Sequence, residues 1–401
     1  MADSSVDART TGTRPSTSRS FYDKEVQAIL WQVVILTIVI GAGYYLYSNM
    51  QYNLEKRQIK TGFDFLSREA GFEIGESLIQ YSAASTYARA FVVGIINTLY
   101  MAAIGIVLAT IIGTVIGIAT LSQNWLVAKL TEWYIHILRN IPVLLQIIFW
   151  YVVFLNDRFF QDARGAEPLF GDVFVTIRGI YAPIPLAHVG WTAALIAIPV
   201  AVVAVWILSA WAKRRQTLTG ETFPTFWVGT AVLLGLPVIA WLAFGAPWEF
   251  ESPRATRFGL RGGGRVTPEF MAVLVGLTVY TSAFIAEIVR AGILSVHKGQ
   301  TEAGRALGLR DSTIMYQIIL PQALRVIIPP TTSQYLNLTK NSSLAVAVGY
   351  PDLVSTGNTT LNQTGQAPEA ILIMMAVYLS ISLGISLFMN WYNAKIQLVE
   401  R

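Results

Sequence analysis

Long apolar stretches alternate with short polar ones along the chain. A transmembrane helix needs about 20 mostly apolar residues, and about eight stretches reach or approach that length. The seventh stretch is the most polar and contains Pro329 and Pro330. The stretches cover residues 28–47, 91–121, 134–155, 191–211, 226–244, 268–289, 326–348 and 370–392. This pattern predicts an all-α membrane protein with about eight transmembrane helices.

The composition of the chain agrees with a membrane protein. Of the 401 residues, 54% are hydrophobic and only 13% are charged, whereas a soluble domain carries roughly 25% charged residues. There is no cysteine, and His136, His188 and His297 lie too far apart in the sequence for metal-ligand spacing. We therefore expect no metal site. The absence of a nucleophile elbow or a zinc-protease motif predicts no catalytic residues and a chain that is not an enzyme.

The N-terminal region divides into a polar tail and an apolar segment. Residues 1–27 begin with a stretch rich in Ser, Thr and Arg, a composition typical of a disordered tail. Residues 28–48 are apolar, and no small-residue cleavage site follows them. We therefore expect an uncleaved, extra N-terminal transmembrane helix behind a cytoplasmic tail.

Lysine and arginine in the short polar segments predict the topology of the chain. Residues 213–215 are Lys-Arg-Arg, and residues 290–325 carry several further cations, so both segments belong in the cytoplasm. Residues 350–368 have no Lys or Arg and belong outside. Both termini are then cytoplasmic. One segment disagrees with this rule, because residues 248–267 belong outside yet carry four arginines, Arg254, Arg257, Arg261 and Arg265.

A patterned polar segment over residues 287–325 is the main candidate for function. Residues 302–307 favour a helix, and Gly308 can adopt the left-handed conformation that ends one. Such a two-turn helix is too short to be stable alone. Two interpretations remain open from the residues. The segment is either a solvated loop that packs on its own bundle, or a docking element whose small residues and Leu307 contact another protein.

Two further features of this segment predict its local structure. Asp311 or Ser312 can cap the helical segment that follows Gly308. Pro321 is expected to break or bend the chain before it returns to the membrane.

The segment resembles the EAA loop of bacterial ABC-importer permeases, in which a short helix fits a groove on a separate ATPase. The matching residues are Glu302, Ala303, Gly308, Ile318, Leu320 and Pro321. Gly304 differs from the alanine usual in the family, and glycine weakens a helix by up to roughly 1 kcal/mol. The resemblance implies an ATPase-coupling site made of Glu302, Ala303, Gly304, Arg305, Leu307, Gly308 and Pro321.

Three further segments resemble the permease subunits of polar amino-acid ABC importers. Residues 139–146 are similar to the family's Arg-x-x-Pro-Leu-Leu-x-Gln signature, and residues 280–292 and 338–350 are similar to two others. The resemblance implies a five-helix permease core over residues 88–155 and 268–393. Residues 156–267 are then an insert of loops and a transmembrane helix pair. This organisation resembles the larger permease subunit of general L-amino-acid importers.

Several polar residues within or beside the apolar stretches are candidates for a substrate path. Unpaired polar groups are costly in an apolar environment, so they either line a wet path or pair with other helices. The alternative for the charged ones is that they snorkel from helix ends. These candidates are Gln146, Glu287, Lys340, Asn341 and Ser342.

The resemblance also implies the partners of the chain. The sequence has no phosphate-binding glycine motif, so no cofactor is expected on this chain and ATP would be used by a separate pair of ATPase subunits. A second permease subunit, a periplasmic amino-acid-binding protein and membrane lipid complete the expected partners, with the extra helix and the insert favouring a heterodimer. Net charge is only +5, and no nucleic-acid partner is expected. The chain would lie in the bacterial cell inner membrane as a multi-pass protein.

Two other kinds of protein remain as alternatives. A secondary transporter driven by an ion gradient would need acidic groups near the membrane midplane and internal repeats. A membrane enzyme would need a catalytic cluster, which the sequence does not show.

Overall fold

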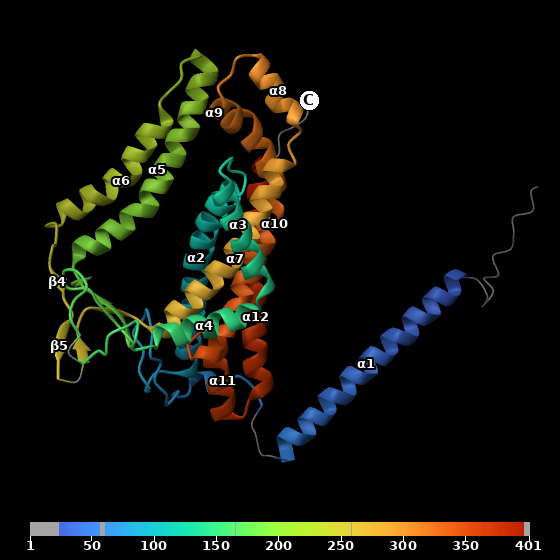
Figure 1. Ribbon diagram of the computed structural model, residues 1–401. Coiled ribbons are helices and arrows are strands. Elements are labelled where there is room, and N and C mark those ends of the chain that lie inside the picture. Colours follow the sequence, from blue (N-terminus) through green and yellow to red (C-terminus); the bar gives the residue numbers. More distant parts are fainter. Residues whose placement is uncertain (1–23, 57–60, 165, 258, 397–401) are drawn as a thin grey trace, which may run out of the picture.

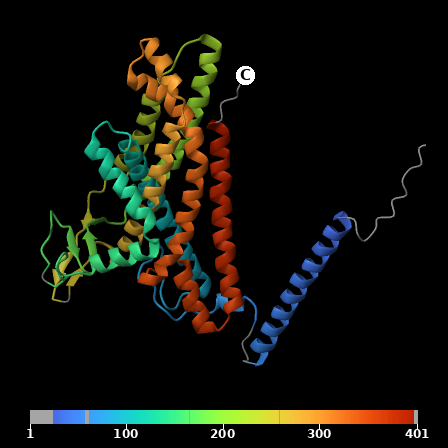
Figure 2. The same cartoon turned by 45° about the vertical axis from the view of Figure 1, so that its right-hand side comes forward.

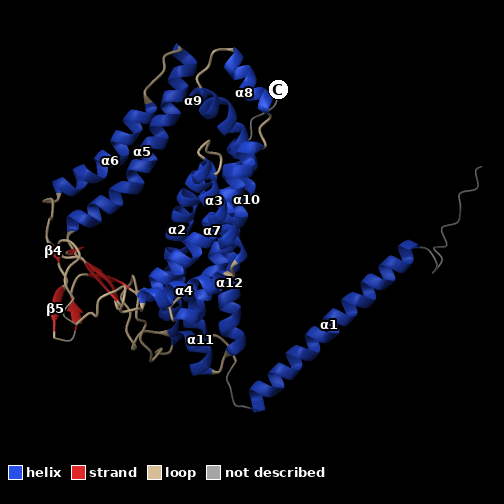
Figure 3. Cartoon of the chain, viewed as in Figure 1, coloured by secondary structure: helices blue, strands red, loops and turns tan. Residues whose placement is uncertain are grey.

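The protein is mostly helical, and its long helices form a bundle (Figures 1 and 3). The computed structural model describes residues 24–56, 61–164, 166–257 and 259–396. The α-helices are α1 (Lys24–Lys56), α2 (Tyr87–Ala119), α3 (Trp125–Asn140), α4 (Val143–Phe154), α5 (Val189–Thr219), α6 (Thr225–Ala243), α7 (Pro268–Leu294), α8 (Lys298–Ala306), α9 (Asp311–Ile314), α10 (Leu320–Asn341), α11 (Leu353–Thr364) and α12 (Ala367–Ile396).

Three short helical segments and seven short strands complete the described chain. The helical segments are the 3-10 helix η1 (Asp64–Ser67), the π-helix η2 (Met315–Ile319) and the 3-10 helix η3 (Ser342–Val348). The strands are β1 (Phe174–Thr176), β2 (Gly179–Ala182), β3 (Ile184–Pro185), β4 (Phe250–Glu251), β5 (Arg254–Thr256), β6 (Gly259–Arg261) and β7 (Gly264–Val266).

Helix α7 forms the centre of the bundle and packs against α2, α3, α4 and α10. Glycines of α2 allow the closest approach. A Cβ atom on Gly113 would lie 2.7 Å from Cβ of Ile285, and one on Gly117 would lie 2.6 Å from the main-chain oxygen of Ala286. The Gly-x-x-x-Gly spacing of α2 therefore brings two backbones together, as small residues do between membrane helices.

The number of spanning helices is lower than the sequence pattern predicts. Within the described residues, six helices are long and apolar enough to cross a membrane, or up to seven if the bent pair α3–α4 counts as one span. The expected span over residues 326–348 corresponds to α10 and η3. These helices are too polar to count among the six candidate spans. The expected span over residues 134–155 is two helices, bent by 105° after Asn140. Pro142 precedes the first turn of α4, where a missing N–H is harmless.

The region between α4 and α7 contains a helix pair and small sheets. Helices α5 and α6 pack on each other as an antiparallel hairpin beside the bundle, and the end of the hairpin near β4 lies farther from the bundle than its turn does (Figure 1). The strands form a sheet of order β1-β2-β7 and the pairs β3–β4 and β5–β6, all antiparallel. The helical membrane fold is confirmed, and the short strands of the insert are an addition that the apolar pattern did not predict.

A long helix occupies the N-terminal region where an extra transmembrane helix is predicted. Residues 1–23 of the predicted tail lie outside the described residues, but Lys24 already begins α1. Helix α1 continues to Lys56, beyond the predicted end at residue 48, and lies apart from the bundle in Figures 1 and 2.

Different segments of the chain lie at the two ends of the bundle. The turn between α5 and α6 lies at the same end as α8 and α9 (Figure 1), and this end carries the basic segments. At the opposite end, residues 61–86 pack beside α11, with Phe65 fully buried against Tyr87. Asn97 of α2 joins two segments there, because its Nδ2 donates to the main-chain oxygens of Glu76 and Pro351, each at 2.9 Å.

Candidate functional site

Helix α8 is a nine-residue polar helix that follows α7 at the basic end of the bundle. Its N-cap is His297, whose Nδ1 accepts a hydrogen bond from the N–H of Gly299 at 3.1 Å. It ends where Gly308 adopts the left-handed conformation (φ +71°), and the N–H of Leu309 donates to the oxygen of Gly304 at 3.1 Å. The short helix and its glycine stop agree with the sequence prediction.

Gly304 does not contribute a free surface to this site. It is buried, and a Cβ atom there would lie 2.8 Å from Cγ1 of Ile314 and 3.5 Å from Cδ1 of Ile318. The expectation that Gly304 opens α8 to another protein is corrected, because its open side is filled by α9 and η2. The glycine that replaces the family's usual alanine instead lets α8 pack on its own chain.

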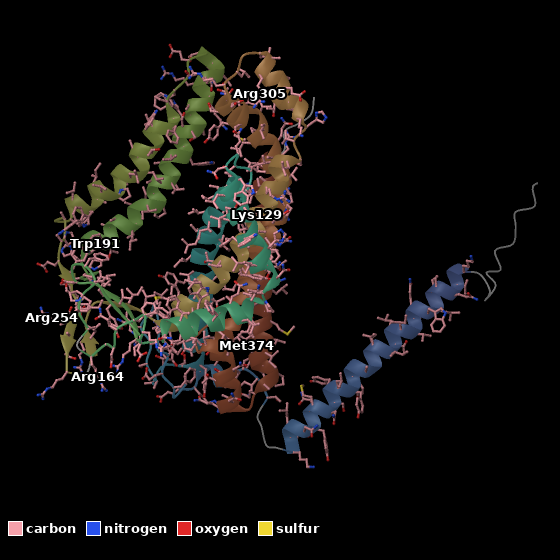
Figure 4. The ribbon with its side chains drawn as sticks, in the orientation of Figure 1. Lys129, Arg164, Trp191, Arg254, Arg305 and Met374 are labelled. Atoms are coloured by element: carbon pink, nitrogen blue, oxygen red, sulfur yellow. The ribbon has the colours of Figure 1, made fainter. Side chains whose placement is uncertain are left out.

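The other coupling residues predicted on α8 form an exposed surface. Leu307 is 79% exposed. Arg305, labelled in Figure 4, forms an ion pair with Asp311 at 3.0 Å between Nε and Oδ1. Because both partners of this pair are exposed, it contributes little free energy. The exposed predicted residues are Glu302, Ala303, Arg305, Leu307 and Gly308.

The segment after α8 differs from the prediction in two respects. Arg310 occupies the N-cap position of α9 without a side-chain hydrogen bond, so Asp311 pairs with Arg305 and does not cap the helix. Of the predicted break or bend at Pro321, the break is absent, because α9, η2 and α10 follow one another without an intervening loop. The π-turn before Pro321 accommodates its missing N–H, and the side chain of Gln322 donates to the oxygen of Ile318 at 2.8 Å.

Gln146, predicted to line a substrate path, braces the bend between α3 and α4. Its side chain is 5% exposed, and Nε2 donates to the main-chain oxygens of Leu138 at 2.9 Å and Ile141 at 3.0 Å. Among the described residues its Oε1 is buried without a hydrogen-bond partner. The amide thus satisfies two carbonyls that the break in the helix would leave unpaired.

Glu287, a second path candidate, lies at a charged cavity between α3 and α7. The cavity has a volume of about 470 Å³. Glu287 is held by Arg290, with 2.6 Å between Oε1 and Nη2. Arg139 of α3 lies over the ring of Phe284, with 5.1 Å from Cζ to the ring centroid. The charged and titratable side chains that line the cavity are Lys129, Glu132, His136, Arg139, Glu287 and Arg290.

The remaining path candidates lie where α10 passes into η3. Lys340 is exposed in the last turn of α10. Ser342 is buried, and its hydroxyl donates to the main-chain oxygen of Thr339 at 2.7 Å. Asn341 is half-buried. The structure therefore distributes the five candidates over three places, namely the α3–α4 bend, the charged cavity and the end of α10.

Sequence reasoning missed residues whose importance depends on tertiary contacts. Ile314 is not one of the residues that match the family motif, yet its side chain packs directly against Gly304. Glu132 and His136 follow Lys129 at helical spacing on α3, so the three side chains lie on one face of the helix. This spacing could have predicted the charged cavity from the sequence.

The end of the bundle opposite α8 contains two carboxyl groups with raised pKa values, of which Asp352 is buried and Glu76 is half-buried. Burial raises the pKa of Glu76, whose Oε1 accepts a hydrogen bond from the N–H of Thr267 at 3.2 Å. Burial also raises the pKa of Asp352 to about 7, although its Oδ1 accepts from the N–H of Ser355 at 2.8 Å. Asp352 caps α11 in the turn after η3. Both groups lie outside the long spanning helices.

Comparison with known proteins defines the family. Residues 214–398 match the family described as "Binding-protein-dependent transport system inner membrane component". The general L-amino acid transport system permease protein AapQ of Rhizobium johnstonii is 48% identical over 390 residues, which cover 97% of each chain.

A second relative has nearly the same coverage. The glutamate/glutamine/aspartate/asparagine transport system permease protein BztB of Rhodobacter capsulatus is 42% identical over 414 residues, which cover 96% of this chain and 97% of the relative. Among solved structures, an amino acid ABC transporter has a TM-score of 0.45 at 18% identity and covers 77% of this chain and 95% of that one.

The chain belongs to the binding-protein-dependent ABC-importer permeases. The extent of the sequence match and its identity over nearly the whole chain carry this conclusion. The resemblance to the permease family is thereby confirmed. The alternative of an ion-gradient-driven secondary transporter is set aside, and the chain is a multi-pass membrane permease.

Proposed function

We propose that this chain is a permease subunit of an amino-acid import system powered by a separate pair of ATPase subunits. The names of its full-length relatives support amino acids as the substrate class. No cofactor is assigned to the chain itself. A second, different permease subunit completes the path, because α1 and the α5–α6 insert give this chain features outside the five-helix core over residues 88–155 and 268–393.

The single observation that carries the coupling mechanism is the exposed end of α8. Leu307 is 79% exposed beside Gly308, while Gly304 fixes the helix to Ile314. An exposed apolar side chain on a rigid polar helix is suited to a pocket on another protein. The coupling site consists of Glu302, Ala303, Arg305, Leu307 and Gly308 on the surface, with Gly304 and Pro321 setting its conformation.

The α8 end of the bundle faces the cytoplasm in this proposal. The basic segments of the α5–α6 turn and of α8–α9 lie at that end, in accord with the positive-inside rule. The end of α12 lies there as well (Figure 2), so the C-terminus is cytoplasmic, and the N-terminus is placed on the same side. The binding protein delivers its amino acid to the opposite end. The chain resides in the bacterial inner membrane.

Transport measurements with a glycine variant test this proposal. A Cβ atom on Gly308 would meet nothing within 4 Å, but the φ of +71° at this residue disfavours most side chains. We expect Gly308→Asp to leave the protein in the membrane while abolishing amino-acid uptake and substrate-stimulated ATP hydrolysis. Undiminished uptake by this variant would contradict coupling through α8. Copurification of the wild-type chain with an ATPase is the accompanying measurement.

A further inference from the structure

Two arginines face each other across the β5–β6 hairpin of the insert. Arg254 and Arg261 are directly paired in the antiparallel register, so both side chains project from the same face of the hairpin. Both are exposed, and within the described residues the structure shows no ion pair for either. Like charges directly opposite each other destabilise a strand pair.

The opposite face of the hairpin is anchored to the insert. Leu260 is 9% exposed and packs with Ala166, Phe174 and Tyr181 in a small apolar cluster. The hydroxyl of Thr256 donates to the oxygen of Gly259 at the turn. The hairpin therefore presents its arginines from a fixed position, which reduces the entropy lost when a partner binds.

The charge of the surrounding segment remains positive when its acids are included. Arg257 is exposed at the turn of the hairpin, next to the Arg254–Arg261 pair. Two exposed carboxylates, Glu249 and Glu251, precede β5. Arg265 is engaged within the insert, because its Nε donates to the oxygen of Arg178 at 3.0 Å. Three exposed arginines of the hairpin thus remain available to an anionic partner.

Arg254 and a row of tryptophans lie at different distances from the α8 end of the molecule. Trp191, Trp241 and Trp248 pack in a row, with ring centroids 5.8 Å and 5.7 Å apart. Tryptophan collects at the membrane–water interface. In Figure 4, Arg254 lies farther from the α8 end than Trp191 does. With the tryptophan row taken as the membrane–water interface, this position of Arg254 favours a water-soluble partner over a lipid surface.

We infer that the β5–β6 hairpin is a docking surface for an acidic patch on the substrate-delivering binding protein. This inference rests on the proposed function, which places the hairpin outside the cell membrane. It also accounts for three of the four arginines that the positive-inside rule disfavours in residues 248–267, namely Arg254, Arg257 and Arg261. Complementary charge at such a contact accelerates encounter and makes it sensitive to salt.

The test uses the complete transporter in phosphatidylcholine nanodiscs, titrated with substrate-loaded binding protein while ATP hydrolysis is measured. For Arg254→Glu/Arg261→Glu we expect the half-maximal concentration of binding protein to rise about tenfold at low salt, a change worth about 1.4 kcal/mol. The basal and maximal rates should not change. The wild-type value should rise with ionic strength more steeply than that of the variant.

Two control variants separate docking from general effects of charge and folding. Arg254→Lys/Arg261→Lys keeps both charges and should retain the wild-type titration to within about threefold. Arg164→Glu reverses an exposed charge elsewhere in the insert (Figure 4) and should have a smaller effect than the hairpin reversal.

Each other outcome overturns the inference in a distinguishable way. A wild-type titration curve for the double glutamate variant shows that the hairpin does not dock the binding protein. An effect that appears only in nanodiscs containing phosphatidylglycerol assigns the hairpin to lipid headgroups. If no binding protein stimulates even the wild type, the proposed function fails and the inference fails with it.

Discussion

Gly304 of α8 and Ile314 of α9 fit each other so closely that a Cβ atom on the glycine would lie 2.8 Å from Cγ1 of the isoleucine. The contact holds a short helix that is too small to be stable alone. It also keeps the exposed face of α8 in a fixed orientation relative to α10, which returns into the bundle.

A paired substitution tests this contact. Gly304→Ala should loosen α8, because overpacking costs roughly 1–3 kcal/mol and exceeds the helix propensity gained, up to roughly 1 kcal/mol. Hydrogen exchange of residues 298–320 should accelerate in the purified protein. Adding Ile314→Ala should recover part of the loss, so that the double variant is less destabilised than the sum of the two single ones. Strict additivity would show that the two side chains do not interact.

Gln146 should matter for stability through the bend between α3 and α4. Gln146→Leu leaves the oxygens of Leu138 and Ile141 without their donor, and each buried unpaired group costs about 1–3 kcal/mol. We expect a lower melting temperature in detergent. Asn140→Ala is the control, because that amide also donates to a main-chain oxygen, at 2.7 Å, but is exposed. Equal effects of the two substitutions would contradict the bracing role.

Close packing of α2 on α7 predicts a position-specific glycine effect. In Gly117→Ala the added methyl group would meet the main-chain oxygen of Ala286 at 2.6 Å, so the helices must separate. We expect reduced thermal stability of the purified protein. Gly384→Ala in α12 has nothing within 4 Å and should be neutral or slightly stabilising. A neutral Gly117→Ala would show that the two backbones are not in contact.

The stability of the protein should fall as pH rises from about 4 to about 7, in part because of Asp352. Burial raises the pKa of this carboxyl from 3.8 to about 7 in the folded protein, so the folded state binds the proton more tightly than the unfolded state does. The stability it contributes is fully present below pH 3.8 and is lost as pH rises through about 7.

Asp352→Asn should remove this pH dependence. Asparagine retains the ability to cap α11 but does not ionise. Thermal melts of wild type and variant between about pH 4 and pH 8 should therefore diverge, with the variant more stable at the upper end by up to a few kcal/mol. Parallel melting curves over that range would contradict a raised pKa.

The sequence predicted most of what depends on local pattern. Gly308 ends α8 and most of the apolar stretches became long helices, because these outcomes follow from residue type and spacing. Residues 326–348 also became helical, as α10 and η3, but they are too polar to count among the candidate spanning helices.

Other features could not be predicted from the sequence, because they depend on tertiary contacts. The inward position of Gly304 depends on Ile314, ten residues away, and no helical periodicity connects them across Gly308. The 105° bend at Asn140 depends on Gln146 reaching back to two carbonyls. The strands of the insert are two to four residues long, which is too short for alternation of apolar residues to be recognised.

Cross-linking at Leu307 tests the central claim most directly. The chain has no cysteine, so Leu307→Cys introduces one reactive thiol at an exposed position, and Leu78→Cys introduces an exposed control at the opposite end. With the assembled transporter and a short thiol–amine cross-linker, we predict that Leu307→Cys joins the ATPase and is protected from maleimide, whereas Leu78→Cys does neither. A thiol at position 307 that stays freely labelled and joins no ATPase would contradict the account.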